Sequence, residues 1–157
     1  MKKLFVCLAV ALAAVACDRN GGGGSPTDPS QVNVEFSTTD LVVGTGAEAV
    51  PGVRATFANW ELFLYDPAGT ASKGRSIQNQ DTVIQTSAGP GPAGPIIFVV
   101  GSGTLIPGFD QGVRGMKVGG RRRMYVPPSM AYGSAGSGQT IPPNASLVFE
   151  VELTGVQ

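Results

Sequence analysis

Residues 105–133 read LIPGFDQGVRGMKVGGRRRMYVPPSMAYG, and this stretch decides the fold that the sequence predicts. Its first part predicts a short amphipathic helix, because Pro107 suits the first helical turn, where its missing N–H costs nothing. Apolar side chains then recur at helical spacing on one face, at Phe109, Val113 and Met116. We expect Gly119 and Gly120 to end this helix.

The second part of the stretch predicts a strand that ends at two prolines. Residues 121–126 read RRRMYV, and neither Pro127 nor Pro128 can donate a hydrogen bond to a strand ladder. Alternate side chains of a strand face opposite sides, so Arg121 and Arg123 would share a surface, which we expect to be solvated. A helix followed by a strand and two apolar loops predicts a concave apolar pocket.

The composition indicates one globular domain with little helix. The chain has 157 residues, 42% of them hydrophobic, with 23 glycines and 12 prolines, which favours short strands joined by tight turns. It contains no histidine, so the usual general base and the commonest metal ligand are both missing. A formal charge of zero gives no sign of a nucleic-acid partner.

The first 16 residues predict a signal peptide. A basic start precedes an apolar run from Leu4 to Ala16, which is shorter than the roughly 20 residues that a spanning helix needs. Two alternatives remain for Cys17, which follows the predicted cleavage point: a free thiol of a secreted protein, or the acylated first residue of a bacterial lipoprotein. The second is favoured because it explains an unpaired cysteine at that point, although Ala14 stands where such leaders more often have leucine.

Residues 17–31 predict a flexible, disordered tether and residues 32–157 the folded domain. The tether contains GGGGSPTDP and has little that could be buried. About 14 such residues have a random-coil span of roughly 20 Å.

Most of the remaining chain has the pattern of strands. Residues 32–36, 53–65 and 96–100 are expected to be strands, and 147–154 to be a closing strand with one wet face. Within the long second strand, simple alternation predicts two faces: Ala55, Phe57 and Asn59 against Thr56, Ala58 and Trp60. Strands before and after a single helix predict an α+β fold.

Three motifs follow one another between residues 96 and 153: LIPGFDQGVRGMKVGGRRR, PPSMAYG and IPPNASLVFEVEL. Together they closely resemble the FK506-binding-protein (FKBP) family of peptidyl-prolyl cis-trans isomerases. The resemblance implies a twisted antiparallel sheet of five to six strands wrapped around one short helix. It also implies that a proline pocket lies between the helix and the sheet.

The same resemblance assigns candidate site residues. Tyr132 would donate its hydroxyl to a substrate carbonyl, Phe109 would replace the family's usual tryptophan at the pocket floor, and the Ile106 backbone would contact the bound peptide. Further candidates for binding the substrate are Leu105, Ile141, Phe149 and Ile96. The alternative for Tyr132 is a structural role in its AYG turn.

The first half of the chain departs from the family pattern. Trp60 falls where the family has a tyrosine, and it is either a pocket residue or plain core. Ile77 and Gln78 fall where the family has an aromatic residue and an aspartate, which makes them the remaining candidates for substrate binding. Without that carboxylate, we expect catalysis to be weaker.

The resemblance implies an enzyme that accelerates Xaa-Pro bond rotation and needs no metal or cofactor. A dry aromatic pocket lowers a barrier of about 18–20 kcal/mol by favouring the twisted amide, which is less polar than the planar one. We expect a monomer, lipid-anchored outside the cytoplasm, acting on secreted or periplasmic polypeptides. The alternatives are a catalytically weak proline-peptide-binding chaperone, or a lipoprotein that uses the domain as a scaffold for a partner.

Overall fold

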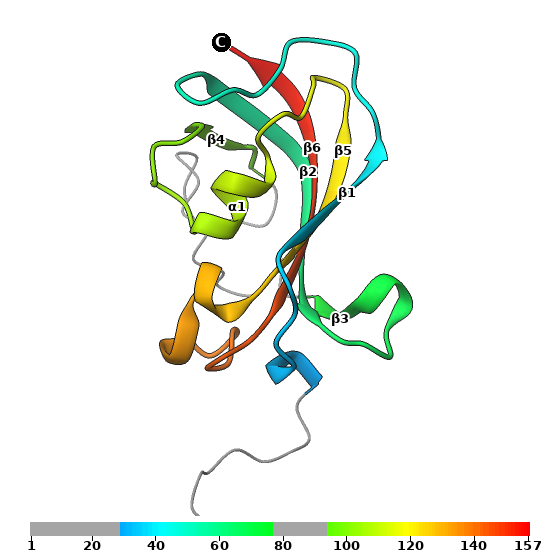
Figure 1. Cartoon of the computed structure of the whole chain (residues 1–157), viewed down its shortest axis with the longest axis vertical. Coiled ribbons are helices and arrows are strands. Elements are labelled where there is room, and N and C mark those ends of the chain that lie inside the picture. The colour runs from blue at the N-terminus through cyan, green and yellow to red at the C-terminus, as the bar shows by residue number, and fades with distance from the viewer. Residues whose placement is uncertain (1–28, 77–93) are drawn as a thin grey trace, which may run out of the picture.

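The computed structural model describes residues 29–76 and 94–157 of the chain (Figure 1). Within these ranges six strands form one antiparallel sheet with the order β1-β5-β6-β2-β3, and β4 pairs with β2. The strands are β1 (Ser37–Val42), β2 (Arg54–Tyr65), β3 (Lys73–Ser76), β4 (Ile96–Val99), β5 (Arg121–Val126) and β6 (Leu147–Val156). The helices are α1 (Pro107–Gly112) and four short 3-10 turns, η1 (Pro29–Gln31), η2 (Thr70–Ser72), η3 (Pro128–Met130) and η4 (Gly133–Ala135).

The sheet twists around α1, which confirms the predicted α+β fold. Figure 1 shows α1 on one side of the central strands, and β3 turned toward the other side. The core fills the space between α1 and the sheet with apolar side chains from β2, β4, β5 and β6. The sheet therefore has an inner face, toward α1, and an outer face.

Helix α1 is shorter than the sequence predicts. It ends at Gly112, although Phe109, Val113 and Met116 are all buried as expected. The backbone after Gly112 turns through Gly115, whose φ is +76°, and pairs with Ala49 instead of continuing the helix. Glycine adopts this left-handed conformation at little cost, so it allows the early stop.

Two glycines bring α1 close to β5. A Cβ atom at Gly108 would overlap the side chain of Val126, and one at Gly112 would overlap the side chain of Met124. The missing side chains therefore let the helix backbone lie directly on the strand.

A β-bulge in β2 makes the predicted faces of this strand wrong at two residues. Ala58 pairs with Glu152 and Glu61 pairs with Glu150, so two residues of β2 lie opposite one residue of β6. Asn59, at φ +48°, is one of the two, and Trp60 is the other. The extra residue reverses the alternation, so Phe57 and Trp60 are buried while Asn59 is exposed.

The outer face of β6 is less exposed to solvent than the sequence predicts. Val148 and Glu150 are buried on β6, and Glu150 is only 2% exposed. The carboxylate of Glu150 pairs with Lys73 at 3.2 Å, Arg121 at 2.8 Å and Arg123 at 2.7 Å. Arg121 and Arg123 do share a surface, but they are part of an ion-pair network and not of an open solvated patch.

The last residues of the predicted tether have a defined structure. Disorder was expected to extend to residue 31, yet Pro29–Gln31 forms η1, in which Ser30 is buried and its carbonyl accepts from the Ser146 N–H at 2.8 Å. Residues 32–36 are not a strand, and β1 starts only at Ser37. The signal peptide, Cys17 and most of the tether lie outside the described residues.

Candidate active site

An aromatic cluster forms the floor between α1 and the sheet. The Phe109 ring lies at its centre and meets three other rings edge to face. Its centroid lies 5.8 Å from those of Phe57 and Phe98 and 5.4 Å from that of Phe149. All four side chains are buried. This floor is buried and apolar, and the edge-to-face contacts hold its rings in one arrangement.

The loop before α1 is held by a buried carboxylate. Asp110 accepts hydrogen bonds from the N–H groups of Gly101 at 2.6 Å and Gly103 at 3.2 Å. Both glycines have positive φ, so the loop turns sharply before it reaches the helix. Leu105 and Ile106 follow, half-buried, and pack against the core.

Ile106 presents its backbone at the edge of the floor. Its carbonyl oxygen accepts from the N–H groups of Phe109 and Asp110, at 3.0 and 3.1 Å, at the start of α1. Among the residues that the structure describes, the N–H of Ile106 has no hydrogen-bond partner. It is therefore available to a carbonyl group of a bound peptide.

Tyr132 lies between η3 and η4, half-buried against the same core. Burial raises the pKa of its hydroxyl, which therefore stays protonated and able to donate at neutral pH. This hydroxyl has no hydrogen-bond partner within residues 29–76 and 94–157. The turn that carries Tyr132 is closed by a hydrogen bond of 2.8 Å from the Asn144 N–H to the Gly133 carbonyl.

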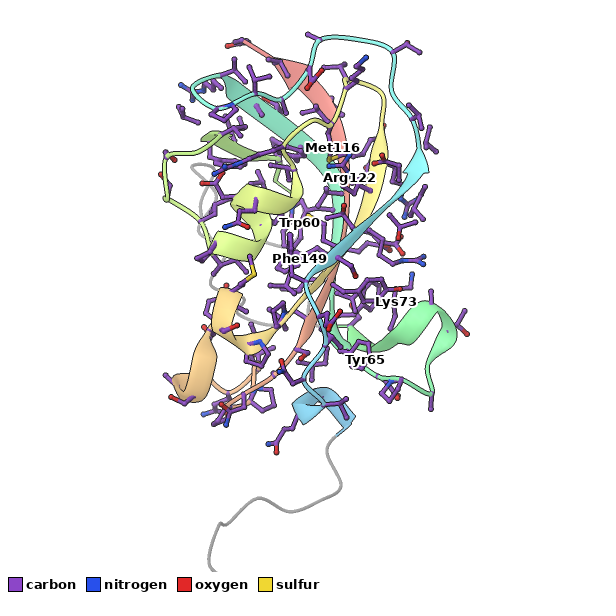
Figure 2. The ribbon with its side chains drawn as sticks, in the orientation of Figure 1. Trp60, Tyr65, Lys73, Met116, Arg122 and Phe149 are labelled. Carbon is purple, nitrogen blue, oxygen red and sulfur yellow. The ribbon has the colours of Figure 1, made fainter. Side chains whose placement is uncertain are left out.

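Trp60 and Phe149 lie between α1 and the sheet (Figure 2). Trp60 is 4% exposed, and its indole N–H donates to the carbonyl oxygen of Gly94 at 3.0 Å. Its ring therefore belongs to the core in this structure, and its polar group is already used. Ile96 and Ile141 are buried in the same cluster.

The structure thus brings most of the predicted site residues together. Five of them belong to the buried core: Trp60, Ile96, Phe109, Ile141 and Phe149. Against them pack Leu105, Ile106 and Tyr132. Ile77 and Gln78 lie outside the described residues. The individual roles of all these residues stay predictions.

Sequence analysis missed Phe57, Phe98 and Asp110. Phe57 and Phe98 were placed on strands but not at the floor, because strand alternation does not say which rings meet across a core. Asp110 follows Phe109 in the helix, and only the fold shows that its carboxylate receives the amides of the preceding loop. No cluster of side chains suited to a metal ion occurs in the part of the chain that is described.

Comparison with known proteins decides the family. The family model for FKBP-type peptidyl-prolyl cis-trans isomerase matches residues 70–154. The chain belongs to this family. FK506-binding protein 2 of Dictyostelium discoideum is 33% identical over 156 residues, which cover 99% of this chain and 99% of that protein.

Other FKBP relatives agree with the fold. The 46 kDa FK506-binding nuclear protein of Spodoptera frugiperda is 38% identical over 130 residues, which cover 83% of this chain. The match spans only 27% of that longer protein. A solved structure of a peptidyl-prolyl cis-trans isomerase from Pseudomonas syringae pv. tomato has a TM-score of 0.56 at 28% identity and covers 78% of this chain and 75% of that one.

Proposed function

We propose that this FKBP chain catalyses cis-trans rotation about Xaa-Pro bonds of polypeptides. One observation carries the proposal: two hydrogen-bond donors that have no partner among the described residues, the Tyr132 hydroxyl and the Ile106 N–H, belong to residues packed against a buried aromatic floor centred on Phe109. A proline ring is apolar and the carbonyls around it accept hydrogen bonds. The aromatic floor can therefore receive the proline ring, and the two donors can bind the carbonyls beside it.

The chemistry needs only differential binding of the twisted amide. Rotation breaks amide resonance at a cost of about 18–20 kcal/mol, and the twisted state has a less polar C–N bond than the planar state. An apolar floor therefore stabilises the twisted state relative to the planar one. The Tyr132 and Ile106 donors hold the flanking carbonyls while the bond rotates.

The finer proposal is that the substrates are secreted or periplasmic proteins and that the chain is anchored through an acylated Cys17. Its support is the leader sequence alone: a basic start, a short apolar run and a cysteine at the predicted cleavage point. In the described ranges no helix is long and apolar enough to cross a membrane.

A second candidate is a proline-peptide-binding chaperone with weak turnover. Two observations favour it. Gln78 stands where the family pattern has an acid. The indole N–H of Trp60 is bonded to Gly94 and cannot donate to a substrate at the same time.

A protease-coupled assay with a short Xaa-Pro peptide separates the two. If the full chain turns the peptide over and the Tyr132→Phe variant does so more slowly, the isomerase proposal is supported. A folded chain that suppresses aggregation of an unfolded protein but shows no turnover supports the chaperone.

The anchor has its own test. When the chain is expressed in bacteria fed a labelled fatty acid, we expect the label and membrane association to disappear in Cys17→Ser. Cys7→Ser, within the leader, is the matched control and should keep both. Equal labelling of the two variants would refute the anchor.

A further inference from the structure

Asn59 is the residue at which β2 changes its buried face. Its φ of +48° lies in the left-handed region, which asparagine enters more readily than most residues other than glycine. The alternation before it buries Phe57, and the alternation after it buries Trp60. Without this bulge, strict alternation would point the Trp60 ring to the outer face.

A side-chain hydrogen bond joins the bulge to β6. Asn59 Nδ2 donates to Glu152 Oε2 of β6 at 2.9 Å. Glu152 pairs with Ala58, the last residue before the bulge. The bond therefore joins the two strands directly beside the irregular residue, and its acceptor is charged, which strengthens it.

The bulge also determines what Trp60 can reach. With the indole on the inner face, its N–H meets the carbonyl oxygen of Gly94, two residues before β4 begins at Ile96. Ile96 in turn pairs with Phe57. One irregularity in β2 thus places the indole in the aromatic core and links it to the start of β4.

We propose that Asn59, fastened by Glu152, is a positioning residue for the proline pocket and acts through the Trp60 indole. The proposal rests on the proposed isomerase or peptide-binding function of this site. The bulge keeps the Trp60 N–H on Gly94, so the indole supports the pocket from within the core and gives a bound peptide no hydrogen bond. Among the described residues that border the floor, the donors without a partner are the Tyr132 hydroxyl and the Ile106 N–H.

Trp60 is the one tryptophan of the sequence, so its fluorescence reports the position of this ring directly. The test measures two quantities in the full chain and in variants of the bulge. They are the quenching of Trp60 fluorescence by acrylamide and the kinetics of isomerisation of an Xaa-Pro peptide. Asn59→Val cannot adopt the left-handed backbone without strain, and Glu152→Leu removes the acceptor. Asn59→Gly keeps the backbone but loses the bond, and Glu152→Gln keeps an acceptor oxygen.

We expect the quenching constant of Trp60 to rise about two-fold or more in Asn59→Val and Glu152→Leu. We also expect KM for the peptide to rise about five-fold with little change in kcat, because the core packing that supports the pocket is displaced. Asn59→Gly should give intermediate values of both quantities, and Glu152→Gln, which keeps an uncharged acceptor, should stay closer to the parent than Glu152→Leu.

Thr154→Val is the matched control. Thr154 Oγ1 donates to the Thr56 carbonyl at 3.1 Å, which joins the same two strands at their other register shift. The Thr154→Val variant should have a lower melting temperature than the parent, with the same quenching of Trp60 and the same KM for the peptide. If Glu152→Leu and Asn59→Gly behave like Thr154→Val, the bulge is merely structural and the proposal is wrong.

The quenching of Trp60 is measured without peptide. The role of Asn59 and the proposed function of the site can therefore be refuted independently. A parent chain that neither turns over nor binds the peptide would refute the proposed function. Unchanged quenching in the bulge variants would refute the role of Asn59, whatever the parent does. If Asn59→Val does not fold, Glu152→Leu and Asn59→Gly decide the question.

Discussion

The rings of Phe109 and Phe149 meet edge to face, with centroids 5.4 Å apart and planes at 81°. Phe109 comes from α1 and Phe149 from the first half of β6, so this contact joins the only α-helix of the described residues to the central strand of the sheet. Such pairs contribute about 0.5–1.5 kcal/mol beyond their buried area. The same rings form the floor of the candidate site, so stability and binding depend on one cluster.

Phe109→Ala is expected to lower the free energy of unfolding by about 3–5 kcal/mol, because it leaves a cavity among the other rings of the floor. It should also weaken peptide binding. Urea denaturation and a peptide titration measure the two effects. Phe109→Leu, which keeps most of the apolar volume, should lose less of both. A parent-like melting temperature for Phe109→Ala would show that this helix face is not buried.

Tyr132→Phe is expected to lower kcat/KM for an Xaa-Pro peptide about five-fold, which corresponds to the roughly 1 kcal/mol of one neutral hydrogen bond. The hydroxyl has no partner in the described structure, so its removal should leave the melting temperature unchanged. The protease-coupled assay and a thermal melt are run together. Unchanged turnover would mean that Tyr132 only anchors its turn.

Gly108→Ala is expected to lower the free energy of unfolding by about 1–3 kcal/mol, because the new methyl group would overlap Val126 and push α1 away from β5. Alanine is otherwise the better helix former, so intrinsic propensity predicts the opposite sign. Chemical denaturation decides between the two. Gln111→Ala, on the exposed side of the same helix, should stay within about 0.5 kcal/mol of the parent.

Glu150→Gln is expected to destabilise the chain at neutral pH by roughly 3 kcal/mol, because it removes the buried carboxylate that three partly exposed cations share. Burial raises the pKa of Glu150, but its hydrogen bonds to Arg123 and Lys73 outweigh burial and hold the pKa below its ordinary value. Since the folded pKa lies below the unfolded one, this stabilisation is present above the unfolded pKa and is lost as pH falls through the folded pKa.

The difference in unfolding free energy between parent and Glu150→Gln should therefore shrink as the pH is lowered below about 4. Denaturation at pH 7 and at several acidic values measures it. Glu61→Gln is the control, since Glu61 is more exposed and, within the described residues, pairs only with Arg121. It should cost less than about 1 kcal/mol at any pH. A difference for Glu150→Gln that stays constant with pH would contradict this account of the network.

The elements that could be predicted are those whose pattern is local. The strand at 121–126 and the burial of Phe109, Val113 and Met116 follow from spacing alone. The end of α1 could not be predicted in this way. Its residues after Gly112 gain hydrogen bonds to Ala49, which lies far away in the sequence.

Two further misses have the same origin. The wet face predicted for β6 is closed at Glu150 by cations that come from β3 and β5. The face of β2 changes at Asn59, where its register against β6 shifts and Glu152 of β6 accepts its side chain. Both depend on which strands become neighbours, and alternation within one strand contains no such information.

The sequence by itself determined the family, through the resemblance of its motifs, and the α+β class, through local periodicity. It also predicted many of the apolar residues that gather between α1 and the sheet, but not the meeting of Phe57 and Phe98 with Phe109. Only the tertiary structure decided that Trp60 faces inward with its N–H bonded to Gly94 and that Glu150 is buried among cations. The physical reason is that a bulge and a buried charge are stable only when a distant strand supplies the partner that satisfies them.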